Sequence, residues 1–278
     1  MNAPVISVLM TAYNREQYIG AAIESVLAST FTDFELIIVD DCSSDKTVQI
    51  GRQYAATDKR VKVYVNEKNL GDYPNRNKAA SHAQAKYLKY VDSDDRIFPH
   101  TLGVMVKAME NHSEAALGLG ARDHDTFGEE EILLTSNEAY HEHLFVNGFL
   151  ENGPLAAIIR KDIFTSIGGF SGKRMIGDIE LWLKIAAKYH VLRLPKGLVY
   201  WRRHEGQEYQ QGGLLYLTAG LQMYAAIVRG KDCPLTASEQ TAVIKAKKKN
   251  SLNILFRYML KTGDIFNTIR HIKTVIAV

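Results

Sequence analysis

Apolar runs of strand length alternate with amphipathic stretches of helical length over the first 112 residues. The apolar runs occupy 5–12, 34–39, 61–65 and 87–91. The stretches with helical spacing occupy 15–28, 47–56, 74–85 and 99–110. Asn14 is placed to cap the first of these helices. Strands that are apolar throughout and alternate with helices predict a mostly parallel α/β sheet with helices on both faces.

The second half of the chain has a less regular pattern. Short helical or strand-like stretches occur at 137–145, 161–167, 179–189 and 198–201. After about residue 212 the chain is predicted to be wholly helical, and Thr236 with Glu239 fits a capping box at the start of one helix. The pattern therefore adds a C-terminal helical extension to the α/β part.

The composition is that of a soluble globular protein, and it does not indicate a particular activity. The chain has 278 residues, of which 46% are hydrophobic and 23% charged, as is ordinary for a soluble globular protein. A net charge of +3 is too small to indicate nucleic acid as a partner. Its two cysteines form neither a disulfide framework nor a metal-binding spacing, and the N-terminus shows a first strand where a signal peptide would have a basic region. A cytoplasmic location is the simplest expectation.

Polar side chains follow three of the predicted strands. They are Thr11 to Asn14, Asp40-Asp41, and Asp92-Ser93-Asp94-Asp95. Because the carboxyl ends of parallel strands meet at one edge of a sheet, where ligands bind, we expect the three groups to lie close together. Two carboxylates spaced by one residue suit Mg²⁺ or Mn²⁺, which take carboxylate and phosphate oxygens.

Each of these features also has a plain structural interpretation. The Asp92-Ser93-Asp94 group fits a solvated turn before the helix that follows Pro99, and Asp40-Asp41 fits the start of an Asx-turn. Tyr13 fits an aromatic residue covering the sheet edge, and Arg76 fits a solvated helical arginine. Taken singly, none of these groups decides a function.

As an ordered set the motifs resemble the family 2 glycosyltransferases of the GT-A fold, whose sheet is Rossmann-like. The matching segments are SVLMTAYNREQYIGAAIESVLASTFTDFELIIVDDCSSDKT, NLGDYPNRNKA, YLKYVDSDD, IGGF, GDIELWLKIA and YWRRHEG. They cover about residues 4–206 in the order and at the spacing of that family. The resemblance implies a nucleotide-sugar-binding half over 1–112, an acceptor-binding and catalytic half over 113–212, and the helical extension over 213–278.

The resemblance also assigns roles to single residues. The residues that it places around the nucleotide are Thr11, Ala12, Tyr13, Asp41, Arg76, Asp92 and Ser93. It implies that Asp94 holds a divalent metal, Mn²⁺ or Mg²⁺, and that Arg203 and His204 contact the leaving diphosphate. Asp178 matches the catalytic base, although Gly177 precedes it where the family often has Glu.

The reaction implied is transfer of a sugar from a UDP- or dTDP-sugar to an acceptor hydroxyl, with inversion and one addition per encounter. The acceptor expected is a glycan or a lipid-linked glycan. The absence of a glycine-rich loop after the first strand disfavours a nicotinamide-dependent oxidoreductase and a sugar nucleotidyltransferase. The remaining alternative is a catalytically silent protein that binds nucleotide-sugars.

The C-terminal segment allows two interpretations. Its apolar residues follow helical spacing, and eight lysines and arginines make it basic over 236–278. A basic amphipathic helix can make peripheral contact with a membrane, whereas a packed appendage or a dimer contact would leave the lysines in water. The pattern leaves both open.

Overall fold

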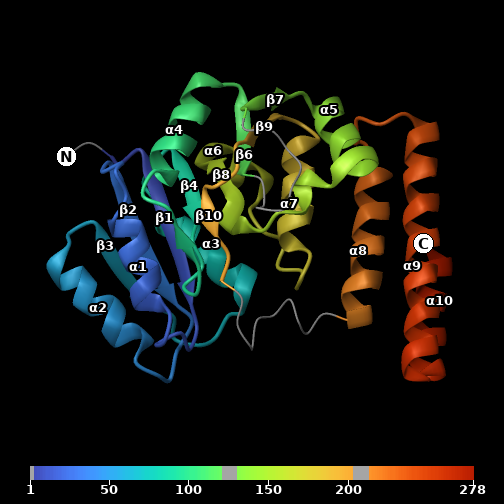
Figure 1. Cartoon of the computed structure of the whole chain (residues 1–278), viewed down its shortest axis with the longest axis horizontal. Helices are drawn as coiled ribbons and strands as arrows, with labels where there is room; N and C mark the ends of the chain where they lie inside the picture. Colours follow the sequence, from blue (N-terminus) through green and yellow to red (C-terminus); the bar gives the residue numbers. More distant parts are fainter. Residues whose placement is uncertain (1–2, 121–129, 203–212) are drawn as a thin grey trace.

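The computed structural model describes residues 3–120, 130–202 and 213–278. Within these ranges an eight-stranded mixed sheet has the order β3-β2-β1-β4-β8-β6-β9-β7, and helices cover both of its faces (Figure 1). Its strands are β1 (Ile6–Ala12), β2 (Phe34–Asp40), β3 (Val61–Val65), β4 (Tyr87–Tyr90), β6 (Ala115–Gly120), β7 (Ile132–Leu134), β8 (Ala157–Arg160) and β9 (His190–Leu194). The first four strands are parallel, as are β6 and β9, while β8 and β7 run antiparallel to their neighbours. The mostly parallel α/β sheet predicted from the sequence is confirmed.

The helices of the α/β part separate into two layers. They are α1 (Ile19–Leu27), α2 (Thr47–Thr57), α3 (Asp72–His82), α4 (Thr101–Asn111), α5 (Ser136–His141), α6 (Lys161–Ile167) and α7 (Gly177–Ala186). A π-helix (Glu142–Asn147) and two 3₁₀ turns (Phe149–Glu151 and Pro154–Ala156) lie between α5 and β8. Alternation along each strand decides the layer: Val8 and Met10 face the core that includes α1 and α4, whereas Leu9 faces the core that includes α3 and α7.

The first helix begins later than the spacing predicts. Asn14 does not cap it, because Asn14 has a φ of 52° and its side chain accepts a hydrogen bond from the Ser44 N–H at 2.9 Å. Residues 15–18 form a turn instead, and α1 starts at Ile19. The Asn14 prediction is therefore wrong, and the polar residues after β1 are free to form the edge of a pocket.

A short ribbon brings a distant segment to the same edge of the sheet. β5 (Arg96–Ile97) pairs antiparallel with β10 (Val199–Tyr200). This pairing places Trp201 and Arg202 beside the segment that follows β4. The Arg202 N–H donates to Asp95 Oδ1 at 2.9 Å.

Three helices follow at the far side of the molecule from β3 (Figure 1). They are α8 (Gly213–Val228), α9 (Ala237–Thr262) and α10 (Ile265–Ala277). Thr236 and Glu239 form the predicted capping box at the start of α9. α8 and the first turns of α9 join the core of the α/β part through Met223, Val228 and Val243. The helical extension is confirmed, and no helix in the described ranges is long and apolar enough to cross a membrane.

Candidate active site

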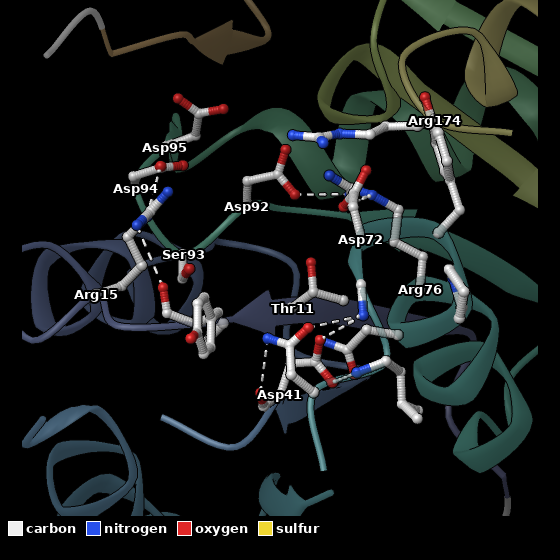
Figure 2. Close-up of a pocket in the computed structure, with 18 of the residues that line it drawn as sticks. Thr11, Arg15, Asp41, Asp72, Arg76, Asp92, Ser93, Asp94, Asp95 and Arg174 are labelled. Carbon is white, nitrogen blue, oxygen red and sulfur yellow. Dashed lines mark hydrogen bonds and ion pairs between the residues drawn. The ribbon is translucent and has the colours of Figure 1, made fainter. Parts of the chain in front are cut away.

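A cavity of about 660 Å³ opens where β1, β2 and β4 end (Figure 2). Eight residues predicted from the sequence line it: Thr11, Ala12, Tyr13, Asp41, Arg76, Asp92, Ser93 and Asp94. The structure therefore brings the three polar groups together at one edge of the sheet, as the topology requires. Asp178 does not line this cavity, and Arg203 and His204 lie outside the described residues.

The Asp41 carboxylate organises the loop that precedes α3. It is buried, and it accepts hydrogen bonds from the Asn66 side chain at 2.8 Å, from the Leu70 N–H at 2.8 Å and from the Gly71 N–H at 2.9 Å. A carboxylate has about four acceptor positions, so these three bonds leave one for a ligand. Tyr13, by contrast, is 48% exposed and lines the cavity.

Arg76 supplies positive charge at the floor of the cavity. Its guanidinium is 9% exposed; Nε donates to Asp72 Oδ1 at 2.8 Å and Nη1 forms an ion pair with Asp92 Oδ1 at 2.7 Å. Burial acts to lower the pKa of Arg76, but the charges of Asp72 and Asp92 outweigh it and raise the pKa well above its ordinary value. Arg76 is thus a permanent buried cation, and the interpretation as a solvated helical arginine is wrong.

The acidic segment after β4 brings three carboxyl groups close together at the cavity, those of Asp92, Asp94 and Asp95. Asp94 pairs with Arg15, whose Nε lies 2.9 Å from Asp94 Oδ2 (Figure 2). Asp95 is 3% exposed, and its pKa is raised to about 8 by burial and by the charges of Asp92 and Asp94. A cation added here would relieve this repulsion.

These carboxylates suit a divalent metal that is also bound by phosphate oxygens. They do not suit a metal that protein side chains alone would enclose. Within the described ranges no three His, Cys, Asp or Glu side chains form a ready metal site. Mg²⁺ characteristically takes one or two carboxylates and completes its shell with substrate phosphates and water. Asp92 and Asp94 on the cavity wall match that mode of binding.

The chain has strong relatives among known proteins. The family model for glycosyl transferase family 2 matches residues 7–172. The chain belongs to glycosyl transferase family 2. Residues 178 and 203–204 lie beyond the span of this match, so the family model does not reach the predicted base.

Curated relatives of this family 2 glycosyltransferase include EpsE of Bacillus subtilis (strain 168), a proposed glycosyltransferase that is 30% identical over 66% of this chain and 67% of its own length. TuaG of the same organism, a proposed teichuronic acid biosynthesis glycosyltransferase, is 43% identical over 34% of this chain. An uncharacterized glycosyltransferase of Methanocaldococcus jannaschii, MJ1057, is 40% identical over 42% of this chain. The chain spans only 37% of TuaG and 41% of MJ1057.

Solved structures share the fold. Staphylococcus aureus TarS (residues 1–349) in complex with UDP-GlcNAc matches 98% of this chain, and 79% of that chain, with a TM-score of 0.73 and 21% identity. The mannosyltransferase PcManGT of Pyrobaculum calidifontis, in complex with GDP-Man and Mn²⁺, matches 99% of this chain, and 85% of that chain, with a TM-score of 0.65 and 14% identity. These likenesses confirm the GT-A fold.

In this family 2 glycosyltransferase, Asp178 is connected to the cavity through Tyr73. It lies in the first turn of α7 and is partly buried; its Oδ1 accepts from the Ile179 N–H at 2.8 Å and from the Tyr73 hydroxyl at 3.3 Å. Burial raises the pKa of Asp178, while these hydrogen bonds and the charge of Arg76 act in the opposite direction. Tyr73 itself lines the cavity.

The unusual Gly177 has a steric explanation. A Cβ on Gly177 would lie 2.7 Å from the Tyr73 ring, closer than real contacts allow. The ring therefore occupies the space that a side chain before Asp178 would need. The family often has Glu before the base; in this chain Tyr73 of α3 fills the space that such a side chain would take.

A loop from the second half of the sheet covers the cavity. Gly172 and Arg174 line it, and Figure 2 shows the Arg174 side chain pointing toward Asp92. The loop is fixed by Glu180 of α7, which accepts from the Ser171 hydroxyl and pairs with Lys173 at 2.9 Å. Arg174 thus adds a cation to the wall opposite Arg15.

Sequence reasoning gave no role to five residues that shape this site: Arg15, Tyr73, Asp95, Arg174 and Trp201. Asp95 belongs to the acidic group predicted after β4, and Arg15 directly follows the polar residues after β1, so position along the chain was an available signal. Trp201 lies in the matching segment YWRRHEG, whereas Arg174 lies in a loop between two matching segments, and nothing local in the sequence marks it. The three non-glycine residues with positive φ in the described ranges, Asn14, Cys42 and Met175, all adjoin lining residues, as strained residues at functional sites often do.

Proposed function

We propose that this chain transfers a sugar from a nucleoside diphosphate donor to an acceptor hydroxyl, with Asp178 as the general base. The observation that carries the proposal is the cavity where Asp41, Tyr13, Arg76 and the acidic segment meet. Its volume of about 660 Å³ falls in the range of ligand pockets, and its wall combines aromatic residues with cations and carboxylates. Such a wall matches a base, a diphosphate and a metal.

The donor favoured is a UDP- or dTDP-sugar. The acceptor position that remains on Asp41 suits the N3–H of uracil or thymine, and the exposed Tyr13 ring suits stacking on the base. Thr11 and Ala12 form the adjoining wall at the end of β1. TarS binds UDP-GlcNAc and PcManGT binds GDP-Man, so the fold accommodates both kinds of base and the choice rests on Asp41.

Asp92 and Asp94 are the residues that would hold a divalent cation, Mn²⁺ or Mg²⁺. Such an ion would neutralise the negative charge that develops on the leaving diphosphate. Holding it requires that the Asp94 carboxylate exchange its contact with Arg15. The Arg15 guanidinium would then be available to the phosphates, and Arg174 adds a second cation to the cavity lining. Arg203 and His204, which lie outside the described residues, are the further residues that we propose contact the leaving diphosphate.

Asp178 is the residue that would remove the proton of the attacking hydroxyl. The two hydrogen bonds described above end on Oδ1, which leaves Oδ2 to accept the proton. The acceptor oxygen then bonds to the anomeric carbon as the carbon–phosphate oxygen bond breaks, and the electron pair leaves with the nucleoside diphosphate. One direct displacement inverts the anomeric centre. The acceptor proposed is a glycan or a lipid-linked glycan.

Calorimetry and a transfer assay test this proposal together. With Mn²⁺ present, UDP or dTDP should bind more tightly than ADP, and the donor should be turned over or hydrolysed. Asp178→Asn should retain donor binding but lose about 10²–10⁴-fold in kcat, the usual size of a general-base contribution. Tight UDP binding with no transfer or hydrolysis by the native chain would instead establish the silent binder. Equal or tighter ADP binding would refute the role of Asp41.

A further inference from the structure

The three C-terminal helices bury one side and expose another. Their shared interior contains Leu214 and Leu221 of α8, Leu255 of α9 and Val275 of α10. Thr218 and His271 add a buried hydrogen bond between α8 and α10, at 3.2 Å. Each of the three helices therefore has one buried row of residues, which packs against the other two.

A second row of large apolar residues on α9 and α10 has no such cover. The α9–α10 face, as we call it, consists of Leu252, Phe256, Leu260, Ile265, Ile269 and Ile276. These side chains are 36%, 55%, 69%, 59%, 46% and 66% exposed, in that order. Ile254 and Phe266, 39% and 86% exposed, are also exposed on these helices. Large apolar residues exposed together on two adjoining helices are of the kind that marks an interaction site.

The exposed rows of α9 and α10 occupy equivalent positions on their helices. At about 100° per residue, each row follows the buried row of its helix by roughly a quarter turn. The helices are antiparallel: Gly263 and Asp264 join them, and Lys248 of α9 reaches the carbonyl of Ile276 of α10 at 3.2 Å. The two helices therefore lie side by side, and each carries its exposed row next to its buried row.

The α9–α10 face has positively charged residues beside it. Exposed basic residues flank it on both helices: Lys245, Lys249, Arg257, Lys261, Arg270 and Lys273. Residues 237–278 include eight basic and two acidic residues, a net charge of +6, whereas the whole chain carries +3. Of the two acids, Glu239 caps α9 and pairs with His141, and Asp264 caps α10.

We propose that the α9–α10 face docks on an anionic membrane surface. An apolar row bordered by lysine and arginine is the arrangement with which amphipathic helices lie in a lipid interface, their apolar side chains among the acyl chains and their cations at the headgroups. A second copy of the chain is the less suitable occupant, because it would bring two segments of charge +6 together. The proposal does not depend on the catalytic roles assigned above.

Vesicle flotation of the full chain tests the proposal. The native protein should float with vesicles that contain phosphatidylglycerol, not with phosphatidylcholine alone, and less at high salt. The variant Phe256→Ser, Leu260→Ser, Ile269→Ser keeps every charge and should lower partitioning at least about tenfold. The variant Arg257→Gln, Lys261→Gln, Arg270→Gln should lower it only at low salt. Phe145→Ser with Val146→Ser removes exposed apolar residues elsewhere and should change nothing.

Circular dichroism and light scattering distinguish the other outcomes. The substituted side chains are exposed, so both α9–α10 variants should keep the native spectrum and remain monomeric. Equal flotation with neutral and anionic vesicles would overturn the proposed lipid class. A native dimer that the apolar variant converts to a monomer, without flotation of either, would show that a second copy covers this face and would overturn the proposal.

Discussion

The carboxyl group of Asp178 is positioned and kept ionised by two residues of another helix. The Tyr73 hydroxyl donates to its Oδ1, and the Asp178 N–H donates back to the same hydroxyl, each at 3.3 Å. Arg76, three positions further along α3, contributes positive charge that lowers the pKa of Asp178 against the effect of burial. The proposed base is therefore held ready by α3 as well as by α7.

Replacing Tyr73 with Phe should move the pH dependence of the rate. A base acts in its ionised form, so kcat falls as the pH drops through its pKa. The tyrosine hydrogen bond lowers the pKa of Asp178; without it the pKa rises, and the acid limb of the kcat profile should move to higher pH. On the plateau, kcat should fall by less than about tenfold.

Tyr54→Phe is the matched control. The Tyr54 hydroxyl also donates to a carboxylate, Glu24, at 2.7 Å, but it lies away from the cavity. That variant should keep the native pH profile. An acid limb for Tyr73→Phe that stays in place or moves to lower pH would contradict the role of Tyr73 in holding the base.

The sequence predicts the site residues that directly follow a strand. It does not predict those that reach the cavity from a distant loop. Asp41, Asp92 and Asp94 lie where the strand pattern predicts them, at the edge of the sheet. Arg174 reaches the same cavity because Glu180 fixes its loop, and Trp201 does so because β10 pairs with β5. Both depend on contacts between segments far apart in sequence, which no local pattern contains.

Among the secondary-structure elements, α3 connects most parts of the site. Its start is held by Asp41, its Asn77 exchanges two hydrogen bonds with the Phe170 backbone, and its Arg76 pairs with Asp92. Tyr73 on the same helix rests against Gly177 at the start of α7. A shift of α3 relative to α7 would therefore disturb the proposed base, the acidic segment and the covering loop together.

Substituting Ala for Gly177 tests this close approach. The added Cβ would lie 2.7 Å from the Tyr73 ring, which must move and break its hydrogen bond with Asp178. We expect a loss of about 1–3 kcal/mol in the free energy of unfolding, as for other overpacked sites, and a clear loss of kcat. Urea unfolding and the transfer assay measure the two effects.

Two further variants separate crowding from a general helix effect. Gly103→Ala, within α4, brings its Cβ to an ordinary 3.7 Å from Phe31 and should leave stability unchanged or raise it by about 0.5–1 kcal/mol. In Gly177→Ala combined with Tyr73→Ser, the space is reopened, so the double variant should lose less unfolding free energy than the two single variants added together, while kcat stays low. If Gly177→Ala behaves like Gly103→Ala, the contact with Tyr73 does not restrict position 177.

Contacts of single residues also explain why the start of α1 differs by four residues from the predicted one. Helical spacing begins at residue 15, but Arg15 pairs with Asp94, and its N–H donates to the Thr47 hydroxyl at 2.7 Å. These contacts hold residues 14–18 in a turn. Hydrophobic periodicity reports which residues face the core, and it contains no information on a polar residue that is held by a pocket.

On the scale of the whole molecule, a small buried polar group connects the C-terminal helices to the α/β part. His143, in the π-helix, shares a 3.0 Å hydrogen bond with the Tyr224 hydroxyl of α8, which also donates to Glu151 at 2.9 Å. Lys247 of α9 lies 3.5 Å from the centre of the Tyr224 ring. The orientation of the α9–α10 face relative to the cavity depends on this junction.

His143 should make the junction sensitive to acid. Burial and the nearby charge of Lys247 lower the pKa of His143 to about 3. In the unfolded chain a histidine has a pKa near 6.5. Between roughly pH 6.5 and 3, His143 is therefore protonated in the unfolded state but not in the folded state. Stability is therefore retained above this window and lost as the pH falls through it.

His143→Gln should remove that part of the acid sensitivity, because glutamine can still bond to the Tyr224 hydroxyl and does not titrate. Between pH 7 and 5 the native protein should lose about 2 kcal/mol more unfolding free energy than the variant, measured by urea unfolding at both values. His100→Gln, which alters an exposed ring near the Gly197 carbonyl, should keep the native pH dependence. A His143→Gln variant as acid-sensitive as the native chain would show that His143 is protonated in the folded state and that the junction is not closed to a proton.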